Sequence, residues 1–325
     1  MIAVQDIAYV RYAAPDLDRM EGFLKDFGLV TTARTPDRLY MRGYGDLPFV
    51  HVTERGEPAS MGIGFLARSA DDLAALARSR GVPVERNPEP GGGQRVRLRD
   101  PAGFAVDVVH GYSPAAALAH RAPVDSNRAG RPARMGGTVR VGAGPAHAER
   151  LGHVVLRCPD FAASLAFYRD VLGFRPSDSY YDGTPDNLVV TFLHCGLGDQ
   201  WTDHHTIAIG RAHDGQARFG HSAFEVTDLD DLAQGNAYLK ARGYRHSWGI
   251  GRHIQGSQVF DYWRDPFSNQ LEHWTDGDLV NDGSPVGLRP AGPNELFQWG
   301  PDVPADFFAP GPALAASRPE KTDEP

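Results

Sequence analysis

Three potential metal ligands lie far apart in the chain: His153, His221 and Glu272. Two imidazoles and one carboxylate on one face of a divalent ion would leave three coordination positions open for a substrate and dioxygen, an arrangement typical of non-haem Fe(II). Structural zinc favours a closed tetrahedral set, often with thiolate ligands. The residue types therefore predict an open metal centre, with Fe(II) as the favoured ion and Mn(II) as the alternative.

An internal repeat places these residues at matched points of its second copy. Three pairs of segments share the same order of strand, turn and helix signals: 7–29 with 151–174, 61–82 with 219–244, and 95–111 with 261–277. Each half therefore contains two units of one strand, one helix and further strands. Because side chains alternate along a strand, each ligand can aim inward from a separate strand.

The first half has the same repeat but lacks the ligand set. Tyr9, Gly62 and Asp107 occupy the positions that correspond to His153, His221 and Glu272. A single histidine in a strand usually belongs to a packed core or its rim, but three ligand-type residues missing together from the sister copy are harder to attribute to packing. We expect a metal centre in the second half only, and a scaffold role for the first half, in which Asp107 has no evident partner.

The chain is expected to divide into two domains, residues 1–112 and 149–305. Between them, residues 113–148 are rich in Ala, Gly, Pro and Arg and have no sustained period, which is typical of a linker. Residues 306–325 are expected to form a disordered tail. The apolar side chains of residues 296–308 are instead expected to pack on the second half.

The composition is that of an ordinary soluble globular protein. The 325 residues carry a net charge of -8 and no sustained basic run, which argues against nucleic acid or an anionic membrane surface as a partner. No apolar run approaches the roughly 18 residues of a membrane helix. Two cysteines cannot form a disulfide framework, and the N-terminus lacks a signal-peptide pattern, so we expect a cytoplasmic protein.

The stretch 251–272 carries a family pattern. In order, it contains Gly251, His253, Tyr262, Asp265–Pro266 and Glu272. This order resembles the signature of the type I extradiol ring-cleaving dioxygenases of the vicinal oxygen chelate superfamily, in the two-domain form related to dihydroxybiphenyl and catechol 2,3-dioxygenases. The likeness covers about residues 1–305. It implies an α+β fold of four βαβββ modules, two in each domain, with the metal in the C-terminal domain only.

The resemblance also implies roles for residues around the metal. His205 matches the acid–base histidine of the family, which takes a proton from the catechol. His253 would hydrogen-bond a substrate atom or an oxygen-derived atom, and Tyr262 would hold the substrate hydroxylate. His204 should point away from His205 if both lie on a strand. The wall of the substrate site is expected to contain Val155, Phe192, His246, Trp248 and Ile254.

Three positions depart from the family pattern. Asp261 precedes the tyrosine of the pattern, where an apolar residue is usual. Relatives commonly carry Asp or Asn three residues after the equivalent of His253, where this chain has Gly256. Ser257 or a water must then take the place of that side chain, or the pocket is wider. Ser268 replaces the usual turn glycine, and it would be strained if the position requires a positive φ.

The reaction implied by the resemblance inserts both atoms of dioxygen into a catecholic ring beside its vicinal hydroxyls. The expected partners are therefore a catecholic small molecule and, as in family relatives, further copies of the same chain. Two alternatives stay open. One is another metal-dependent enzyme of the superfamily, an isomerase or a thiol transferase, and the other is a resistance protein that sequesters a small molecule.

Overall fold

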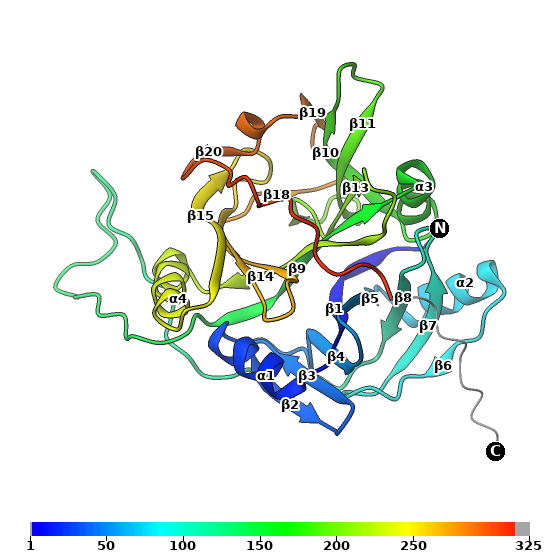
Figure 1. The fold of residues 1–325 in the computed structure, drawn as a ribbon, viewed down its shortest axis with the longest axis horizontal. Coiled ribbons are helices and arrows are strands. Elements are labelled where there is room, and N and C mark those ends of the chain that lie inside the picture. Colours follow the sequence, from blue (N-terminus) through cyan, green and yellow to red (C-terminus); the bar gives the residue numbers. More distant parts are fainter. Residues whose placement is uncertain (1, 316–325) are drawn as a thin grey trace.

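The computed structural model describes residues 2–315 and contains two sheet-rich halves (Figure 1). The first half consists of β1 (Val4–Ala14), α1 (Leu17–Asp26), β2 (Val30–Arg34), β3 (Arg38–Arg42), β4 (His51–Arg55), β5 (Ala59–Ala67), α2 (Ala70–Arg80), β6 (Glu85–Arg86), β7 (Gln94–Arg99) and β8 (Ala105–His110). These elements form two successive βαβββ modules.

The second half repeats this order and adds short elements. It consists of β9 (Ala148–Cys158), α3 (Phe161–Asp170), β10 (Phe174–Tyr181), β11 (Leu188–Cys195), β12 (Thr202–Asp203), β13 (Ile207–Arg211), β14 (Arg218–Val226), α4 (Leu229–Ala241), β15 (Arg245–His253), β16 (Val259–Arg264), β17 (Gln270–Thr275), β18 (Leu279–Val280), β19 (Gly287–Pro290), the short helix η1 (Pro293–Glu295) and β20 (Phe297–Trp299). The α+β class predicted from the sequence is confirmed.

Each of the four α-helices begins at a side chain that caps it. Asp16, Ser69, Asp160 and Asp228 each accept a hydrogen bond from the backbone N–H three residues further on. Such caps satisfy an N–H group that has no partner within the helix. The acidic and Ser positions at the predicted helix starts therefore have a direct structural role.

The strand order is the same in the two main sheets. The first sheet runs β2-β3-β4-β1-β5-β8-β7-β6, and the second runs β10-β11-β13-β9-β14-β17-β16-β15, with β19 and β20 added at its edges. At the centre of each sheet, an antiparallel pair is followed by a parallel pair: β1 with β5 and β5 with β8, then β9 with β14 and β14 with β17. The internal repeat is confirmed at the level of topology.

The strand registers also confirm that the ligand positions were aligned correctly. Equivalent residues form equivalent pairs: Tyr9 with Gly64 and Gly64 with Asp107 in the first half, His153 with Ala223 and Ala223 with Glu272 in the second. The three candidate ligands therefore lie on three adjacent strands at the centre of the second sheet.

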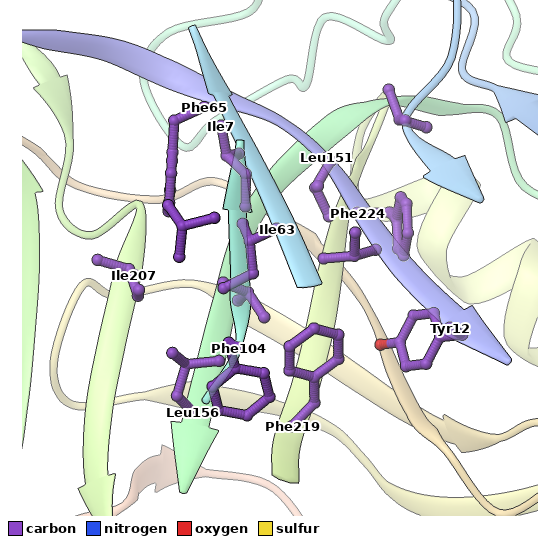
Figure 2. Close-up of a cluster of buried hydrophobic side chains, with 14 of the residues drawn as sticks. Ile7, Tyr12, Ile63, Phe65, Phe104, Leu151, Leu156, Ile207, Phe219 and Phe224 are labelled. Carbon is purple, nitrogen blue, oxygen red and sulfur yellow. The ribbon is translucent and has the colours of Figure 1, made fainter. Parts of the chain in front are cut away.

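The hydrophobic core runs through both halves. Figure 2 shows Ile63 and Phe104 of the first half close to Leu156 and Phe219 of the second. The rings of Phe104 and Phe219 are stacked, with centroids 5.3 Å apart. Because one apolar cluster contains residues of both sheets, each half covers part of the other from water.

The segment between the halves has little regular structure. Residues 111–147 contain no helix and no named strand, which agrees with the composition of a linker. The exact domain boundaries remain a prediction. No helix within residues 2–315 is long and apolar enough to cross a membrane.

The chain beyond β20 differs from the expected disordered tail. Phe307 is buried, and Arg264 donates hydrogen bonds of 3.0 Å to the carbonyl oxygens of Phe307 and Ala309. Leu314 pairs with Ser60 of the first half. The expectation of disorder is therefore wrong for residues 306–315, because this segment finds apolar contacts and backbone partners in both halves.

The expectation of a disordered tail also covered residues 316–325, which lie outside the described residues. The expectation that residues 296–308 pack on the second half is confirmed. Side chains of residues 296–308 pack with the second half in a cluster around Trp248, Phe260 and Tyr262.

Candidate metal centre and cavity

Strands β9, β14 and β17 bring His153, His221 and Glu272 together. Nε2 of His153 and Nε2 of His221 each lie 3.2 Å from Oε2 of Glu272, and they lie 3.4 Å from one another. Three ligand atoms on one face of an octahedron, each about 2.1 Å from the ion, would be about 3.0 Å apart. The three side chains therefore have the spacing of a facial ligand set, and no other such group is found within residues 2–315.

The electrostatics of this group fit a divalent cation. Glu272 is completely buried, and neither of its carboxylate oxygens has a hydrogen-bond partner among residues 2–315. Burial acts to raise the pKa of Glu272, but the contacts with His153 and His221 lower it overall. Burial lowers the pKa of His221 to about 4, so its imidazole is neutral at pH 7. A buried carboxylate without hydrogen bonds is costly unless a cation compensates it.

At the equivalent place in the first half, a hydrogen bond between two side chains takes the place of a metal site. The Tyr9 hydroxyl donates to Oδ2 of Asp107 at 2.5 Å. The expectation that Asp107 has no partner is therefore wrong, because a phenol has replaced the first histidine and satisfies the carboxylate directly. Gly62, in place of the second histidine, supplies no ligand atom.

His204 and His205 lie in the loop that joins β12 to β13. Their Nδ1 atoms are 3.1 Å apart, and Nε2 of His204 lies 2.6 Å from Oδ2 of Asp178. The expectation that the two imidazoles point apart is wrong, because it required a strand with alternating side chains. The ring of His205 also lies 4.0 Å from that of His153, so it adjoins the candidate metal ligands.

These contacts can fix the tautomer of His205. The Asp178 carboxylate can only accept, so Nε2–H of a neutral His204 donates to it. Nδ1 of His204 is then an acceptor, and Nδ1–H of His205 donates to it. Nε2 of His205 is left with a free lone pair, and His205 lines the cavity. Burial lowers the pKa of His205 well below its ordinary value, with a smaller contribution from His153.

Gly256 provides the space that His204 occupies. Its φ is +74°, and a Cβ atom added there would lie 3.0 Å from Nδ1 of His204. Ser257 does not take the place of the missing side chain, because its hydroxyl donates to Asp278 at 2.7 Å. The imidazole of His204 fills that position instead.

His253 and Tyr262 form a hydrogen-bonded pair on β15 and β16. Nδ1–H of His253 donates to the carbonyl oxygen of Leu296 at 2.7 Å, which leaves Nε2 to accept from the Tyr262 hydroxyl at 2.8 Å. Burial lowers the pKa of His253. Burial and the charge of Glu272 raise the pKa of Tyr262, so the pair is neutral. Both residues line the same cavity as the candidate ligands.

The structure places three of the five expected wall residues in the cavity: Val155, Phe192 and Trp248. His246 and Ile254 are not among the described residues that line it. Nε2 of His246 lies 2.7 Å from Asp261, and a register irregularity in β15 separates His246 from Trp248. Such irregularities change which side chains share a face. Ile254 follows the end of β15 in a bend and does not line the cavity, although His253 and Gln255 on either side of it do.

The cavity also has lining residues that are not among the five expected wall residues. The Tyr180 hydroxyl lies within hydrogen-bond distance of the side-chain oxygen of Gln255 and of the backbone carbonyl oxygen of Glu295, the latter at 2.6 Å. Tyr180 and Gln255 both line the cavity. Phe307 closes the wall beside Trp248. The positions of Tyr180 and Phe307 depend on where the C-terminal segment packs, because Glu295 and Phe307 both belong to it.

Comparison with known proteins assigns the family. Residues 150–273 match the Glyoxalase/Bleomycin resistance protein/Dioxygenase superfamily. Metapyrocatechase 2 of Cupriavidus necator is 33% identical, over 94% of this chain and 92% of that protein. An iron-dependent extradiol dioxygenase of Rhodococcus jostii is 28% identical, over 93% of this chain and 98% of that protein.

Solved structures show the same fold. A Mn(II)-bound glyoxalase from Novosphingobium aromaticivorans superposes with a TM-score of 0.78 at 25% identity, over 96% of this chain and 97% of that chain. Homoprotocatechuate 2,3-dioxygenase of Brevibacterium fuscum has a TM-score of 0.77 at 19% identity, over 97% of both chains. The chain therefore belongs to the Glyoxalase/Bleomycin resistance protein/Dioxygenase superfamily and, within it, to the extradiol dioxygenases.

Proposed function

We propose that the chain is an extradiol dioxygenase that inserts both atoms of dioxygen into a catecholic ring next to its hydroxyls. The observation that carries the proposal is the group of three candidate metal ligands: His153, His221 and Glu272. Two further histidines and a tyrosine line the same cavity: His205, His253 and Tyr262. The similarity to a metapyrocatechase along nearly the whole chain supports the same reaction.

Fe(II) is the proposed ion, with Mn(II) as the alternative. The ligand set of two imidazoles and one carboxylate is typical of non-haem Fe(II) sites. One relative is named as iron-dependent, whereas one structural neighbour contains Mn(II). When bound, the ion would supply the Lewis-acid and redox chemistry that joins a catechol to dioxygen.

The protein's own groups would bind the substrate and move its protons. Nε2 of His205 would accept a proton from a catechol hydroxyl, since the imidazole is neutral and its other nitrogen is engaged. The hydroxyl oxygen of Tyr262, whose proton is donated to Nε2 of His253, would accept a hydrogen bond from the other catechol hydroxyl, and His253 would hold Tyr262 in that orientation. Three apolar side chains would hold the ring and exclude water: Val155, Phe192 and Trp248.

Anaerobic loading with Fe(II) or Mn(II), followed by oxygen and either monocyclic or bicyclic catechols, tests the proposal. We expect oxygen uptake together with a yellow ring-fission product. Glu272→Ala should lose the bound metal, measured by elemental analysis. Asp107→Asn is the matched control, because it changes the equivalent carboxylate and keeps an acceptor for Tyr9.

Metal retained by Glu272→Ala would rule out the ligand set. No oxygen uptake by the loaded protein with any catechol would exclude the dioxygenase and leave an isomerase, a transferase or a sequestering protein. The homo-oligomeric state and the cytoplasmic location remain predictions from the sequence.

A further inference from the structure

The cavity extends far beyond the candidate metal ligands. It encloses about 840 Å³, in the upper part of the range of roughly 300–1,000 Å³ that is common for sites of drug-sized ligands. His153, Val155 and Arg157 line it from one face of β9. Four residues of strand correspond to about 13 Å, so Arg157 lies about that far along the strand from the candidate ligand His153.

Positive charge gathers at this far end. Arg157, Arg211 and Arg218 line it together with one carboxylate, that of Asp214. Arg218 pairs with Asp214, with Nη2 2.7 Å from Oδ2. Arg211 donates to the carbonyl oxygen of Leu188 at 2.9 Å, which leaves its charge without compensation. Three guanidinium groups against one carboxylate leave an excess of two positive charges.

Arg157 is the group without a polar partner. Within residues 2–315 its guanidinium makes no hydrogen bond or ion pair, and its ring contact is Phe308, with Cζ 6.0 Å from the centroid. It packs directly on Gly210, where an added Cβ atom would lie 2.5 Å from Nη1. Burial lowers the pKa of Arg157, and the charge of Arg218 acts in the same direction. Arg157 is half-buried, and a half-buried guanidinium without an acceptor is stabilised by an anion.

We propose that this far end binds an anionic group of the substrate, so that the preferred catechol carries a carboxylate on an apolar substituent about one aromatic ring long. The inference rests on the proposed function, which fixes the catechol at the other end. A carboxylate can accept two parallel hydrogen bonds from Arg157. Between the two ends the cavity is lined by apolar groups: Val155, Val189, Ala208 and Phe219.

Two dihydroxybiphenyls of equal size provide the test. One carries a carboxylate at the para position of its second ring, and the other carries a primary carboxamide there. We expect the wild-type protein to favour the carboxylate in kcat/KM by about tenfold or more, because a hydrogen bond between two charged groups is stronger than one to a neutral amide. Arg157→Gln should lower kcat/KM for the carboxylate about tenfold more than for the carboxamide and so remove this preference.

Arg78→Gln, which changes an exposed arginine on α2, is the control and should keep the preference. Equal kcat/KM for the two compounds in the wild type, or equal losses for both in Arg157→Gln, would overturn the proposal. Titration calorimetry of both compounds tests the anionic subsite independently of the proposed dioxygenase activity, because it measures binding without turnover. Tighter binding of the carboxylate that is lost in Arg157→Gln supports the anionic subsite even in a protein that cleaves neither compound.

Discussion

Ser268 has a left-handed backbone in the turn between β16 and β17, with φ at +71°. This confirms the strain expected where the family has glycine. A residue with a Cβ atom is destabilised by about 1–2 kcal/mol in the left-handed region. Glycine avoids this strain, but its greater conformational freedom in the unfolded chain offsets part of the gain in stability. Ser268→Gly should therefore raise the free energy of unfolding by about 1 kcal/mol, measured by urea denaturation. A lower stability would contradict this account.

Asp178 should act on catalysis through His204 and His205. Asp178→Asn replaces an obligate acceptor with an amide, so His204 is no longer held in one tautomer and His205 is less often ready to accept a proton. We expect kcat to fall about tenfold with little change in KM at equal metal content. Steady-state kinetics with a catechol measures both parameters.

Two variants test whether this effect belongs to the carboxylate. Asp178→Glu should restore much of kcat, because it keeps the charge and the acceptor. Asp182→Asn, an exposed aspartate beyond the end of the same strand, should behave as the wild type. A fall in kcat that is equally large in Asp182→Asn would remove the link to His204.

At the residue scale, the sequence predicted positions on regular strands and failed where a loop or an irregularity decided the orientation. The grouping of His153 and Glu272 followed from matched places in a repeat. The contact of His204 with His205 was missed because the loop conformation could not be inferred. His246 was assigned to the wrong face because the irregularity in β15 is not visible in the sequence.

At the scale of elements, the segment after β20 forms part of the cavity wall. Phe307 packs against Trp248 and Tyr262, with ring centroids 4.8 and 5.1 Å away. Phe307→Ala should lower the free energy of unfolding by about 3 kcal/mol and raise KM, because it opens the wall beside Tyr262. Urea denaturation and steady-state kinetics measure the two effects. Phe308→Ala, which truncates an exposed neighbour, should leave the stability within about 0.5 kcal/mol of the wild type.

The helices and strands of the four modules followed from the strand, turn and helix signals of the repeat, because these signals are local. The packing of residues 306–315 depends on partners more than 40 residues away, such as Arg264 and Ser60. Such partners leave no pattern within the segment itself, and its Pro and Ala content resembles a disordered tail. Long-range contacts of this kind explain the part of the fold that the sequence did not predict.

At the scale of the whole molecule, polar contacts join the two halves as well as the shared core. The Tyr12 hydroxyl donates to Oγ of Ser222 at 2.9 Å, and the Tyr168 hydroxyl donates to Asp100 at 3.0 Å. Nε2–H of His273, next to the candidate ligand Glu272, donates to the carbonyl oxygen of Phe27 at 2.6 Å. The half without a candidate metal site therefore supports the strand that carries the acidic ligand.

The shared core predicts that the two halves unfold together. All five tryptophans lie in the second half, between Trp201 and Trp299, so their fluorescence reports on that half alone. Leu39, on β3 of the first half, is fully buried in the common cluster. Leu39→Ala should lower the free energy of unfolding by about 3 kcal/mol and shift the fluorescence transition in urea by the same amount as the transition in circular dichroism. An unchanged fluorescence midpoint, with only the dichroism shifted, would mean that the halves unfold independently and that the first half does not stabilise the candidate metal site.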